Sequence, residues 1–529
     1  MKTRPGLSNV DSDTSGDGLL LGGILGTDQY QLTMAQMYWR EGLAERPAQF
    51  DYFFRSYPDY GTHQAGYCVT AGLGWLLDWM ASARFGKHEL EYLRTQMTPE
   101  GDRRFNDGFV DWLAGNGGFG SIVVDAVPEG RIVHANVPVA TVTGPLAMAQ
   151  ILETPFLNRL NYPTLVATKA SRVKEAGRGR PVLEFGMRRG PASGADAGGR
   201  AALIGGCDFS SNVALSHAVG LDPKGTHAHS LVQVYLALGL GELEAFRRFG
   251  AIYPDECVLL VDTVDVLTSG VPNAITVFEE LAAEGHQPGG IRLDSGDLAY
   301  FAIQSALLLN EAGFDDVPIV LSSDLDELVI WQILSQIETE APGYGISVAS
   351  MVERLTFGVG TRLITSEGDP SLGGVYKLVA VEDEAGQWAP AIKVSEDVEK
   401  VPIPGDKDVY RFYDSRGLAT ADVVALAGEE LPGSGTLDLY HPHRDAHRSL
   451  EPSSLSAIEP LMTRVFEHGD RKDGSPDIED LRARRIADLS RLDPGVRRLV
   501  NPHIYHVSLT PGMKQLQRDL VAEALGEGG

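Results

Sequence analysis

The chain has 529 residues, enough for about three domains of ordinary size, and its 43% hydrophobic and 22% charged residues are typical of a folded enzyme and exclude a disordered or fibrous protein. Its 45 Lys and Arg against 72 Asp and Glu give a net charge of −27, so most of its surface repels nucleic acid and anionic membranes, and an anionic ligand needs a local basic pocket. Three scattered cysteines exclude a disulfide framework and no apolar run reaches about 18 residues, so we expect a soluble cytoplasmic protein.

The N-terminal part predicts a tail followed by a mixed α/β domain. Residues 1–24 are rich in Ser, Asp and Gly, so we expect a flexible tail, with the first domain at 25–180. A helix should begin near Asp28, whose side chain can cap free backbone N–H groups while Gln31 reaches back to it. Alternating aromatic residues at 50–54 predict a strand.

From 181 to 365, short apolar runs alternate with amphipathic stretches of helix length, which predicts a parallel sheet built from β-α units. Polar residues follow nearly every predicted strand, whereas an open sheet would gather its ligand at one point. The pattern therefore favours an irregular TIM-like α/β barrel with its active site at the rim. The predicted strands are 182–185, 201–204, a short one near Ala228, 258–261, 291–293, 319–321 and 355–359. The predicted helices are 211–219, 232–249, 273–284, 298–313 and 325–336.

The C-terminal segment, 366–529, predicts strands and turns followed by a helical region. Its strand-like stretches are 375–381, 388–393 and 409–413, and the acidic, Arg-rich region 478–500 should be helical. We expect this segment to pack on the N-terminal domain, so that both ends of the chain form the mixed α/β domain beside the barrel.

Several familiar catalytic motifs are missing from the sequence. It contains no GxxxxGK[ST], no HExxH and no GxSxG, which argues against a P-loop nucleotidase, a zincin and an ordinary α/β-hydrolase. The stretches 72–74 and 358–360 are incomplete GxG matches, and each alone is most often a tight turn. Residues 258–270 superficially resemble the phosphoribosyl pyrophosphate loop of type I phosphoribosyltransferases, but their spacing is stretched and the β-α count does not suit that smaller fold.

The segment GTHAHS places His227 and His229 two residues apart, on one side of a predicted strand. Three interpretations stay open. Both histidines can simply bond to backbone groups. They can be two ligands of a metal site that needs a third. One imidazole can also act as a nucleophile that accepts a phosphoryl group and passes it on.

Arg292 and Asp294 lie two residues apart in RLDSGD, so both should point into the barrel mouth if the strand is regular. Arginine suits a carboxylate or phosphate because it offers two parallel hydrogen bonds. The alternative is a purely structural Arg–Asp pair. Residues 295–297 precede a predicted helix and look like an N-cap, and helix N-termini attract phosphate.

Two further strand ends carry residue types that bind ligands. EFGMRRG offers the flat ring of Phe185 and the guanidinium of Arg188, although a Phe belongs by default to the core and an Arg to the surface. Gly360 and Thr361 close the seventh β-α step, where barrels commonly hold a phosphate. Only the joint position of these residues argues for a site.

Seven segments, in order, resemble the nicotinate phosphoribosyltransferase family over nearly the whole chain, from Leu25 to about residue 415. Seven ordered motifs are far more specific than any one of them. Gln29 and Val264 depart from the residues usual in the family, and neither carries a charge that the chemistry needs. The segments are TDQYQLTM (27–34), EFGMRRG (184–190), GTHAHS (225–230), LVDTVDVLTSGVPNA (260–274), GIRLDSGDL (290–298), FGVGTRLIT (357–365) and SLGGVYKLVAV (371–381).

The resemblance implies a type II phosphoribosyltransferase that works as a homodimer with sites near the interface. The implied reaction joins nicotinate to phosphoribosyl pyrophosphate, yields nicotinate mononucleotide and pyrophosphate, and is coupled to ATP hydrolysis in the salvage of NAD. By position, His229 is similar to the histidine that ATP phosphorylates. Tyr30, Thr226 and Arg292 match nicotinate-binding positions, and Thr361 matches a phosphoribosyl pyrophosphate contact.

The related nicotinamide enzyme implies roles for two more residues, and the general chemistry of Mg²⁺ suggests a metal site. Phe185 is similar in place to a Phe that stacks on the pyridine ring, and Arg188 to an Arg that contacts phosphate. Asp262 and Asp294 are candidates for holding the Mg²⁺ that accompanies pyrophosphate, although such ions keep several waters and rarely leave a spacing signature.

The residue chemistry agrees with this resemblance. A pyridine nitrogen already has a free lone pair, so its attack on the ribose carbon needs positioning and a stabilised oxocarbenium-like centre rather than a general base. Arg292 facing the nicotinate carboxylate would reject nicotinamide, because a neutral amide leaves a buried cation unpaired. Two alternatives stay open: a quinolinate- or nicotinamide-type transferase, and a barrel that binds a phosphorylated metabolite without turning it over.

Overall fold

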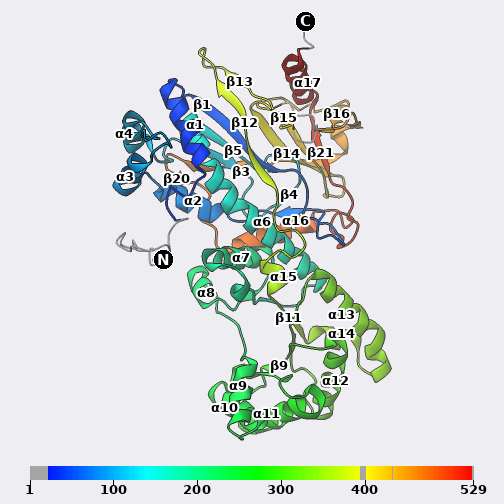
Figure 1. Ribbon diagram of the computed structural model, residues 1–529. Helices are drawn as coiled ribbons and strands as arrows, with labels where there is room; N and C mark the ends of the chain where they lie inside the picture. The colour runs from blue at the N-terminus through cyan, green and yellow to red at the C-terminus, as the bar shows by residue number, and fades with distance from the viewer. Residues whose placement is uncertain (1–21, 394–400, 432, 527–529) are drawn as a thin grey trace.

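The structure is a computed structural model that describes residues 22–393, 401–431 and 433–526. Figure 1 shows two large sheets, built by both ends of the chain, in the upper part of the molecule, which we call the body. Below it, the parallel sheet and its helices form what we call the lobe. In the described ranges, no helix is long and apolar enough to cross a membrane.

The first sheet of the body consists of seven antiparallel strands from distant parts of the chain. Its central strand pairs with β12 on one side and β5 on the other, and Tyr52 lies opposite both Tyr376 and Ala140. The strand predicted at 50–54 is part of this central strand. In order across the sheet, the strands are β13 (Trp388–Pro390), β12 (Gly374–Glu382), β1 (Pro47–Phe54), β5 (Ala140–Pro145), β3 (Val123–Ala126), β19 (Thr463–Glu467) and β20 (Asp470–Arg471).

The C-terminal residues also build a six-stranded mixed sheet beside the first. Its order is β17 (His447–Leu450), β16 (Leu437–Tyr440), β21 (His506–Leu509), β15 (Ala419–Leu426), β14 (Lys407–Asp414) and β18 (Leu455–Pro460). A two-stranded sheet of β2 (Cys68–Val69) and β4 (Ile132–Val133) completes the body. Its helices are α1 (Gln29–Arg40), α2 (Leu73–Ser82), α3 (Lys87–Thr95), α4 (Asp107–Asn116), α5 (Leu146–Ile151), α6 (Glu153–Ala176), α16 (Ile478–Ser490) and α17 (Pro511–Leu525).

The lobe is a curled, six-stranded parallel sheet covered by helices. Its strands are short runs of Val, Ile and Leu, as expected for strands that are buried on both faces. Their order is β7 (Phe209–Ser210), β6 (Val182–Glu184), β11 (Leu355–Val359), β10 (Ile319–Leu321), β9 (Gly290–Leu293) and β8 (Val258–Leu260). The helices are α7 (Ala192–Gly205), α8 (Val213–Val219), α9 (His229–Ala237), α10 (Glu242–Ile252), α11 (Val271–Ala283), α12 (Leu298–Glu311), α13 (Glu327–Glu340), α14 (Val348–Glu353) and α15 (Thr361–Ile364).

The described strands do not form the closed barrel that we predicted, because β7 and β8 are edges of an open sheet. The run predicted as a strand at 201–204 belongs to α7, where it is buried against α6. A short apolar run that is buried on all sides looks the same in a helix and in a strand, which explains this error. The stretch near Ala228 is irregular and leads directly into α9.

Two further boundaries differ from the predictions, and the predicted tail is almost entirely untested. The helix predicted at 232–249 is two helices, separated by Gly239 and Gly241, whose positive φ angles end one helix and precede the next. The helical region predicted at 478–500 ends at Ser490. The predicted tail lies outside the described residues except for 22–24, where Ile24 is buried.

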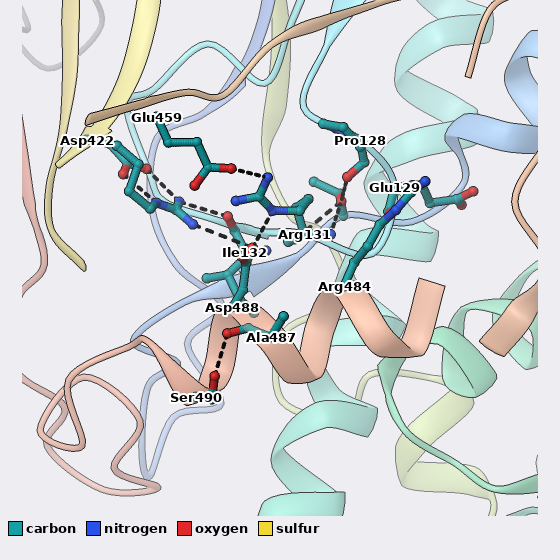
Figure 2. A network of polar contacts seen from close by, with 12 residues as sticks. Pro128, Glu129, Arg131, Ile132, Asp422, Glu459, Arg484, Ala487, Asp488 and Ser490 are labelled. Carbon is teal, nitrogen blue, oxygen red and sulfur yellow. Dashed lines mark hydrogen bonds and ion pairs between the residues drawn. The ribbon is translucent and has the colours of Figure 1, made fainter. Parts of the chain in front are cut away.

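A buried ionic network joins the two ends of the chain within the body (Figure 2). Arg131 donates from Nε to Asp488 Oδ2 at 2.7 Å and from Nη1 to Glu459 Oε1 at 2.9 Å. Arg411 donates to both oxygens of Asp422, at 2.8 Å each. Removing one partner of such a pair leaves a buried charge uncompensated. The network therefore ties the segment before β4 to β14, β15, β18 and α16.

Candidate active site

Arg292 is held at the carboxyl end of β9 by three side chains. Its Nε donates to Ser322 Oγ at 2.9 Å, its Nη1 to Thr226 Oγ1 at 3.2 Å and its Nη2 to Asp294 Oδ1 at 3.0 Å. Ser322 in turn donates to Asp294 Oδ1 at 2.5 Å. The structural pair of Arg292 and Asp294 is therefore present, but it belongs to a network from three separate segments of the chain.

The ring of Phe185 lies close to both Arg292 and Gly358 of β11. Arg292 Cζ is 5.4 Å from the ring centroid, within reach of a cation–π interaction. A Cβ atom at Gly358 would lie only 2.6 Å from Phe185 Cε2. Gly358 therefore lies within a strand rather than in the tight turn that a GxG match suggests, and its missing side chain makes room for the Phe185 ring.

His229 is the first residue of α9, and not a strand residue as predicted. Its Nε2 lies 2.9 Å from Asp262 Oδ1, and Asp262 Oδ2 accepts a hydrogen bond from Ser295 Oγ at 2.6 Å. The Asp262 side chain is 2% exposed, whereas that of His229 is 37% exposed. Because a carboxylate only accepts, this contact assigns the ring proton to Nε2 and leaves a lone pair on Nδ1.

His227 has the structural role of the first interpretation. Its Nε2 accepts a hydrogen bond from the Leu260 backbone N–H at 3.1 Å, and its ring packs against Phe249 with centroids 5.0 Å apart. Burial lowers the pKa of His227, which keeps the ring neutral. The two histidines do not form a metal pair, because this Nε2 is already engaged; among the described residues, no three His, Cys, Asp or Glu side chains form a metal-binding group.

Gly360 and Thr361 follow β11, and Arg188 follows β6, three residues after Phe185. A Cβ atom at Gly360 would lie 3.2 Å from the carbonyl oxygen of Phe185, and Thr361 begins α15 directly after it. Arg188 lies in the 3₁₀ turn Met187–Arg189 and is exposed. These residues share the carboxyl end of the sheet with Arg292, so the structure brings together the predicted residues from β6, β9 and β11.

Tyr30 is the one predicted site residue that lies elsewhere. It is 49% exposed on α1 in the body, whereas α9 and β9 lie in the lobe (Figure 1). It lines a pocket of about 340 Å³ whose other walls include Asn158, Tyr162 and Ser371. Asp28 does not cap α1 as predicted; its carboxylate accepts a hydrogen bond from the Thr154 hydroxyl at 2.7 Å and so docks the start of α1 on α6.

The other incomplete GxG, at 72–74, is filled by an internal carboxylate. Glu129 accepts hydrogen bonds from the backbone N–H groups of Gly72, at 2.6 Å, and Gly74, at 3.1 Å. Arg200 donates to both oxygens of Glu129, at 2.6 and 2.9 Å. Glu129 therefore occupies the anion position at the start of α2, which excludes this turn as a phosphate site.

Comparison with known proteins decides the family. Residues 25–161 match the nicotinate phosphoribosyltransferase N-terminal domain, and residues 406–517 match the nicotinate phosphoribosyltransferase C-terminal domain. The nicotinate phosphoribosyltransferase of Bacillus subtilis is 38% identical over 489 residues, which cover 92% of each chain. The human nicotinate phosphoribosyltransferase is 33% identical over 550 residues, which cover 94% of this chain and 96% of the relative. The chain belongs to the nicotinate phosphoribosyltransferase family.

Solved structures agree with this membership. The crystal structure of human nicotinic acid phosphoribosyltransferase has a TM-score of 0.75 at 30% identity, covering 93% of this chain and 99% of that one. A nicotinate-nucleotide pyrophosphorylase from Pyrococcus furiosus shares the fold, with a TM-score of 0.63 at 21% identity. The resemblance inferred from the seven motifs is confirmed.

In this member of the nicotinate phosphoribosyltransferase family, the positioning roles of three polar residues of the site were not predicted from the sequence. Ser322 holds Arg292, and no motif distinguishes it from other serines that follow strands. Ser295 holds Asp262; it lies in GIRLDSGDL and was interpreted only as part of a helix N-cap. Glu184 is buried at the end of β6, where it accepts hydrogen bonds from Ser210 and from the Gly186 N–H. Burial raises the pKa of the Glu184 carboxyl. The signal in the sequence was its place at the end of a predicted strand, in the segment EFGMRRG.

Proposed function

We propose that this chain catalyses the nicotinate phosphoribosyltransferase reaction, coupled to ATP, in the salvage of NAD. Nicotinate and phosphoribosyl pyrophosphate would give nicotinate mononucleotide and pyrophosphate, and His229 would carry the phosphoryl group of ATP. One observation supports the proposal most directly. Thr226 accepts a hydrogen bond from Arg292 and lies three residues before His229, so the cation and the imidazole share one rim of the sheet.

Arg292 and Phe185 suit a planar aromatic acid. The guanidinium offers charge-assisted hydrogen bonds to the carboxylate, and the Phe185 ring offers a face on which a pyridine ring can stack. A neutral amide in the same place would leave the partly buried cation without its anion. This difference favours nicotinate over nicotinamide.

The transfer step needs no general base. The pyridine nitrogen uses its own lone pair to form a bond to ribose C1, while the bond from C1 to the pyrophosphate oxygen breaks and its electron pair leaves with pyrophosphate. The Thr361 hydroxyl and the exposed Arg188 guanidinium are donors suited to the phosphate groups of the sugar. Positioning and charge stabilisation then supply the acceleration.

His229 suits phosphoryl transfer because Asp262 holds its Nε2–H, which leaves the lone pair on Nδ1, and because its side chain is 37% exposed. Nδ1 would attack the γ-phosphorus of ATP, forming an N–P bond as ADP leaves, and water would later take the phosphoryl group as phosphate. The buried carboxylate stabilises the positive charge that the ring acquires in the phosphorylated form.

For Mg²⁺, Asp294 fits better than Asp262. Both oxygens of Asp262 accept hydrogen bonds, from His229 and from Ser295, whereas Asp294 receives its hydrogen bonds on Oδ1 alone within the described residues. Asp294 Oδ2 would therefore hold the ion, with waters and pyrophosphate completing its shell. Bound there, Mg²⁺ would neutralise charge on the departing pyrophosphate.

A homodimer accounts for the separate position of Tyr30. In a dimer with sites near the interface, the exposed ring of Tyr30 from one subunit would reach the Arg292 cluster of the other. The pocket beside Tyr30 is then part of the surface that faces the partner subunit.

Product formation from nicotinate and phosphoribosyl pyrophosphate, with and without ATP, tests the proposal. We expect nicotinate mononucleotide and a higher rate with ATP. Labelled ATP should leave an acid-labile, base-stable phosphate on the wild type and on His217→Ala, whose histidine is exposed on α8, but not on His229→Ala. Turnover of quinolinate or nicotinamide alone would indicate the related transferases, and turnover of none of the three would indicate a binding protein.

A further inference from the structure

The contacts of Arg292 distinguish two edges of its guanidinium. The side edge, formed by Nε–H and the adjacent N–H of Nη2, is covered by Ser322 Oγ and Asp294 Oδ1. Nη1 gives one N–H to Thr226. Each Nη nitrogen carries two N–H groups, so Nη1 and Nη2 each retain one for which the described part of the chain offers no acceptor. We assign to Thr226 the N–H of Nη1 that points away from Nη2, so the two remaining groups make up the end edge.

Ser322 determines that the side edge is the covered one. Its single hydroxyl proton goes to Asp294 Oδ1 at 2.5 Å, so its oxygen is free to accept the Nε–H of Arg292. The parallel register sets Leu321 opposite Leu293, which brings Ser322 beside Asp294 on the neighbouring strand. Ser322 is 3% exposed, so water does not readily replace its hydroxyl.

Without this hydroxyl, the Nε–H of Arg292 has no acceptor and Asp294 loses a donor. While no Mg²⁺ is bound at Asp294 Oδ2, the guanidinium is then free to turn and give both Nη groups to the two oxygens of Asp294, as in an ordinary bidentate ion pair. That ion pair uses the two N–H groups of the end edge, so they are no longer available to a substrate. The Ser322 hydroxyl thus prevents Arg292 from forming this bidentate ion pair with Asp294.

We infer that Ser322 is a positioning residue that keeps the Nη1–Nη2 edge of Arg292 open for a planar carboxylate bound end-on. The inference rests on the proposed function and names the group that sets its substrate class. Two parallel N–H donors match two carboxylate oxygens, whereas the NH₂ of a carboxamide would face one of those N–H groups. Selection of the acid over the amide therefore depends on which edge is presented.

The variant Ser322→Ala tests this inference through separate kinetic constants. We expect the KM for nicotinate to rise at least about tenfold, the size expected for one lost hydrogen bond to a charged group. The KM for phosphoribosyl pyrophosphate and kcat at saturating nicotinate should stay within about twofold, and the preference for nicotinate over nicotinamide should fall. Ser305→Ala is the matched control, because Ser305 is equally buried on α12 with no hydrogen bond to its hydroxyl, and it should change neither KM.

A double-variant cycle separates positioning from general damage. In an Arg292→Ala background, Ser322→Ala should add nothing to the loss of nicotinate affinity, because the edge that it protects is gone. Equal increases in both KM values, or additive losses in the double variant, would overturn the inference.

Calorimetric titration keeps the inference separate from the proposed reaction. If the wild type binds nicotinate at least about tenfold more tightly than nicotinamide, and Ser322→Ala loses that difference, the inference holds even without turnover. If the wild type binds both equally, the inference fails whatever the reaction is.

Discussion

Asp262 Oδ1 lies 2.9 Å from Nε2 of His229, and the carboxylate is almost completely buried while the imidazole is more than one-third exposed. The buried partner fixes the proton on one ring nitrogen, and the accessible partner presents the other. Sequence position alone did not pair these two residues, which come from different β-α units. The phosphohistidine proposal depends on this contact.

Replacing Asp262 with Asn should lower the rate of ATP-dependent labelling at least about 100-fold, because an amide can donate to Nε2 and so place the ring proton on Nδ1. Initial rates of label incorporation measure this. Ser295→Ala, which removes only the second hydrogen bond of Asp262, should cost less than about tenfold. Equal losses in the two variants would contradict the tautomer argument.

Arg292→Ala and Arg188→Ala should affect different substrates. Arg292→Ala should raise the KM for nicotinate by about 10- to 100-fold, the range for a charge-assisted hydrogen bond, with a much smaller change for phosphoribosyl pyrophosphate. Arg188→Ala should raise the KM for phosphoribosyl pyrophosphate much more than the KM for nicotinate, since its guanidinium is assigned to phosphate. Steady-state kinetics with each substrate varied in turn checks both, and a pair of variants that weaken the two substrates alike would point to misfolding.

Gly358→Ala should impair nicotinate binding through Phe185. The added methyl group would lie 2.6 and 2.7 Å from two ring carbons of Phe185, so the ring must leave its present position at the site. We expect the KM for nicotinate to rise about tenfold, in line with the loss of a stacking contact. Gly115→Ala, in open space on α4, is the control and should leave both KM values unchanged. If Gly358→Ala raises the KM for nicotinate by the same factor in a Phe185→Ala background, displacement of the Phe185 ring is not the cause.

Glu327→Gln should destabilise the protein in a pH-dependent way. Burial raises the pKa of Glu327, but the hydrogen bond from His63 and the charges of Lys169 and Arg172 outweigh it and lower that pKa to about 2. The folded-state pKa lies below the unfolded value of about 4.3, so the stabilisation is complete above about pH 5 and is lost as the pH falls toward 2.

At pH 7 the Gln variant should therefore melt several degrees below the wild type, because breaking a buried ionic cluster costs about 3–5 kcal/mol. The difference in melting temperature between the two proteins should become smaller as the pH is lowered from 5 toward 2. Glu338→Gln on the same helix removes a half-exposed pair with Arg178 and should cost less than about 1 kcal/mol. If the difference in melting temperature between the wild type and Glu327→Gln became larger as the pH falls, the lowered pKa of Glu327 would be contradicted.

Tyr30→Ala and Arg292→Ala should complement each other if the site spans two subunits. At a nicotinate concentration near the KM of the wild type, each variant alone should have low activity, because each lacks one part of every site. Mixing them with exchange of subunits should restore activity, since a mixed dimer contains one intact site. Activity that stays at the sum of the separate variants would place Tyr30 outside the site or leave the chain monomeric.

The sequence predicted the strands β8 to β11 and the helices α11 to α13 because these elements have clear periodicity and Asp caps, such as Asp297 before α12. It failed at 201–204, where four apolar residues within a helix resembled a buried strand. The strand pairing of the first body sheet joins residues hundreds of positions apart, as with Tyr52 and Tyr376, and no local pattern carries that information.

The site was predicted through its charged and aromatic residues, since Arg292, Asp294, His229 and Phe185 have few roles at a strand end. The side chains that support these residues were not predicted. A serine hydroxyl such as that of Ser322 has a role only because the register of two strands brings it beside Asp294. The glycine motif at 72–74 shows the opposite case. Its backbone donors suit phosphate, and only the three-dimensional position of Glu129 reveals that they are already occupied.

The central strand β1 needs a neighbour, β12, that follows it by roughly 320 residues. While the ribosome is still synthesising the lobe, one edge of β1 has backbone groups that nothing yet satisfies, and such edges invite pairing with other chains. Nascent chains should therefore depend on chaperones until β12 emerges. Truncations that end within the lobe should aggregate rather than yield a soluble N-terminal fragment.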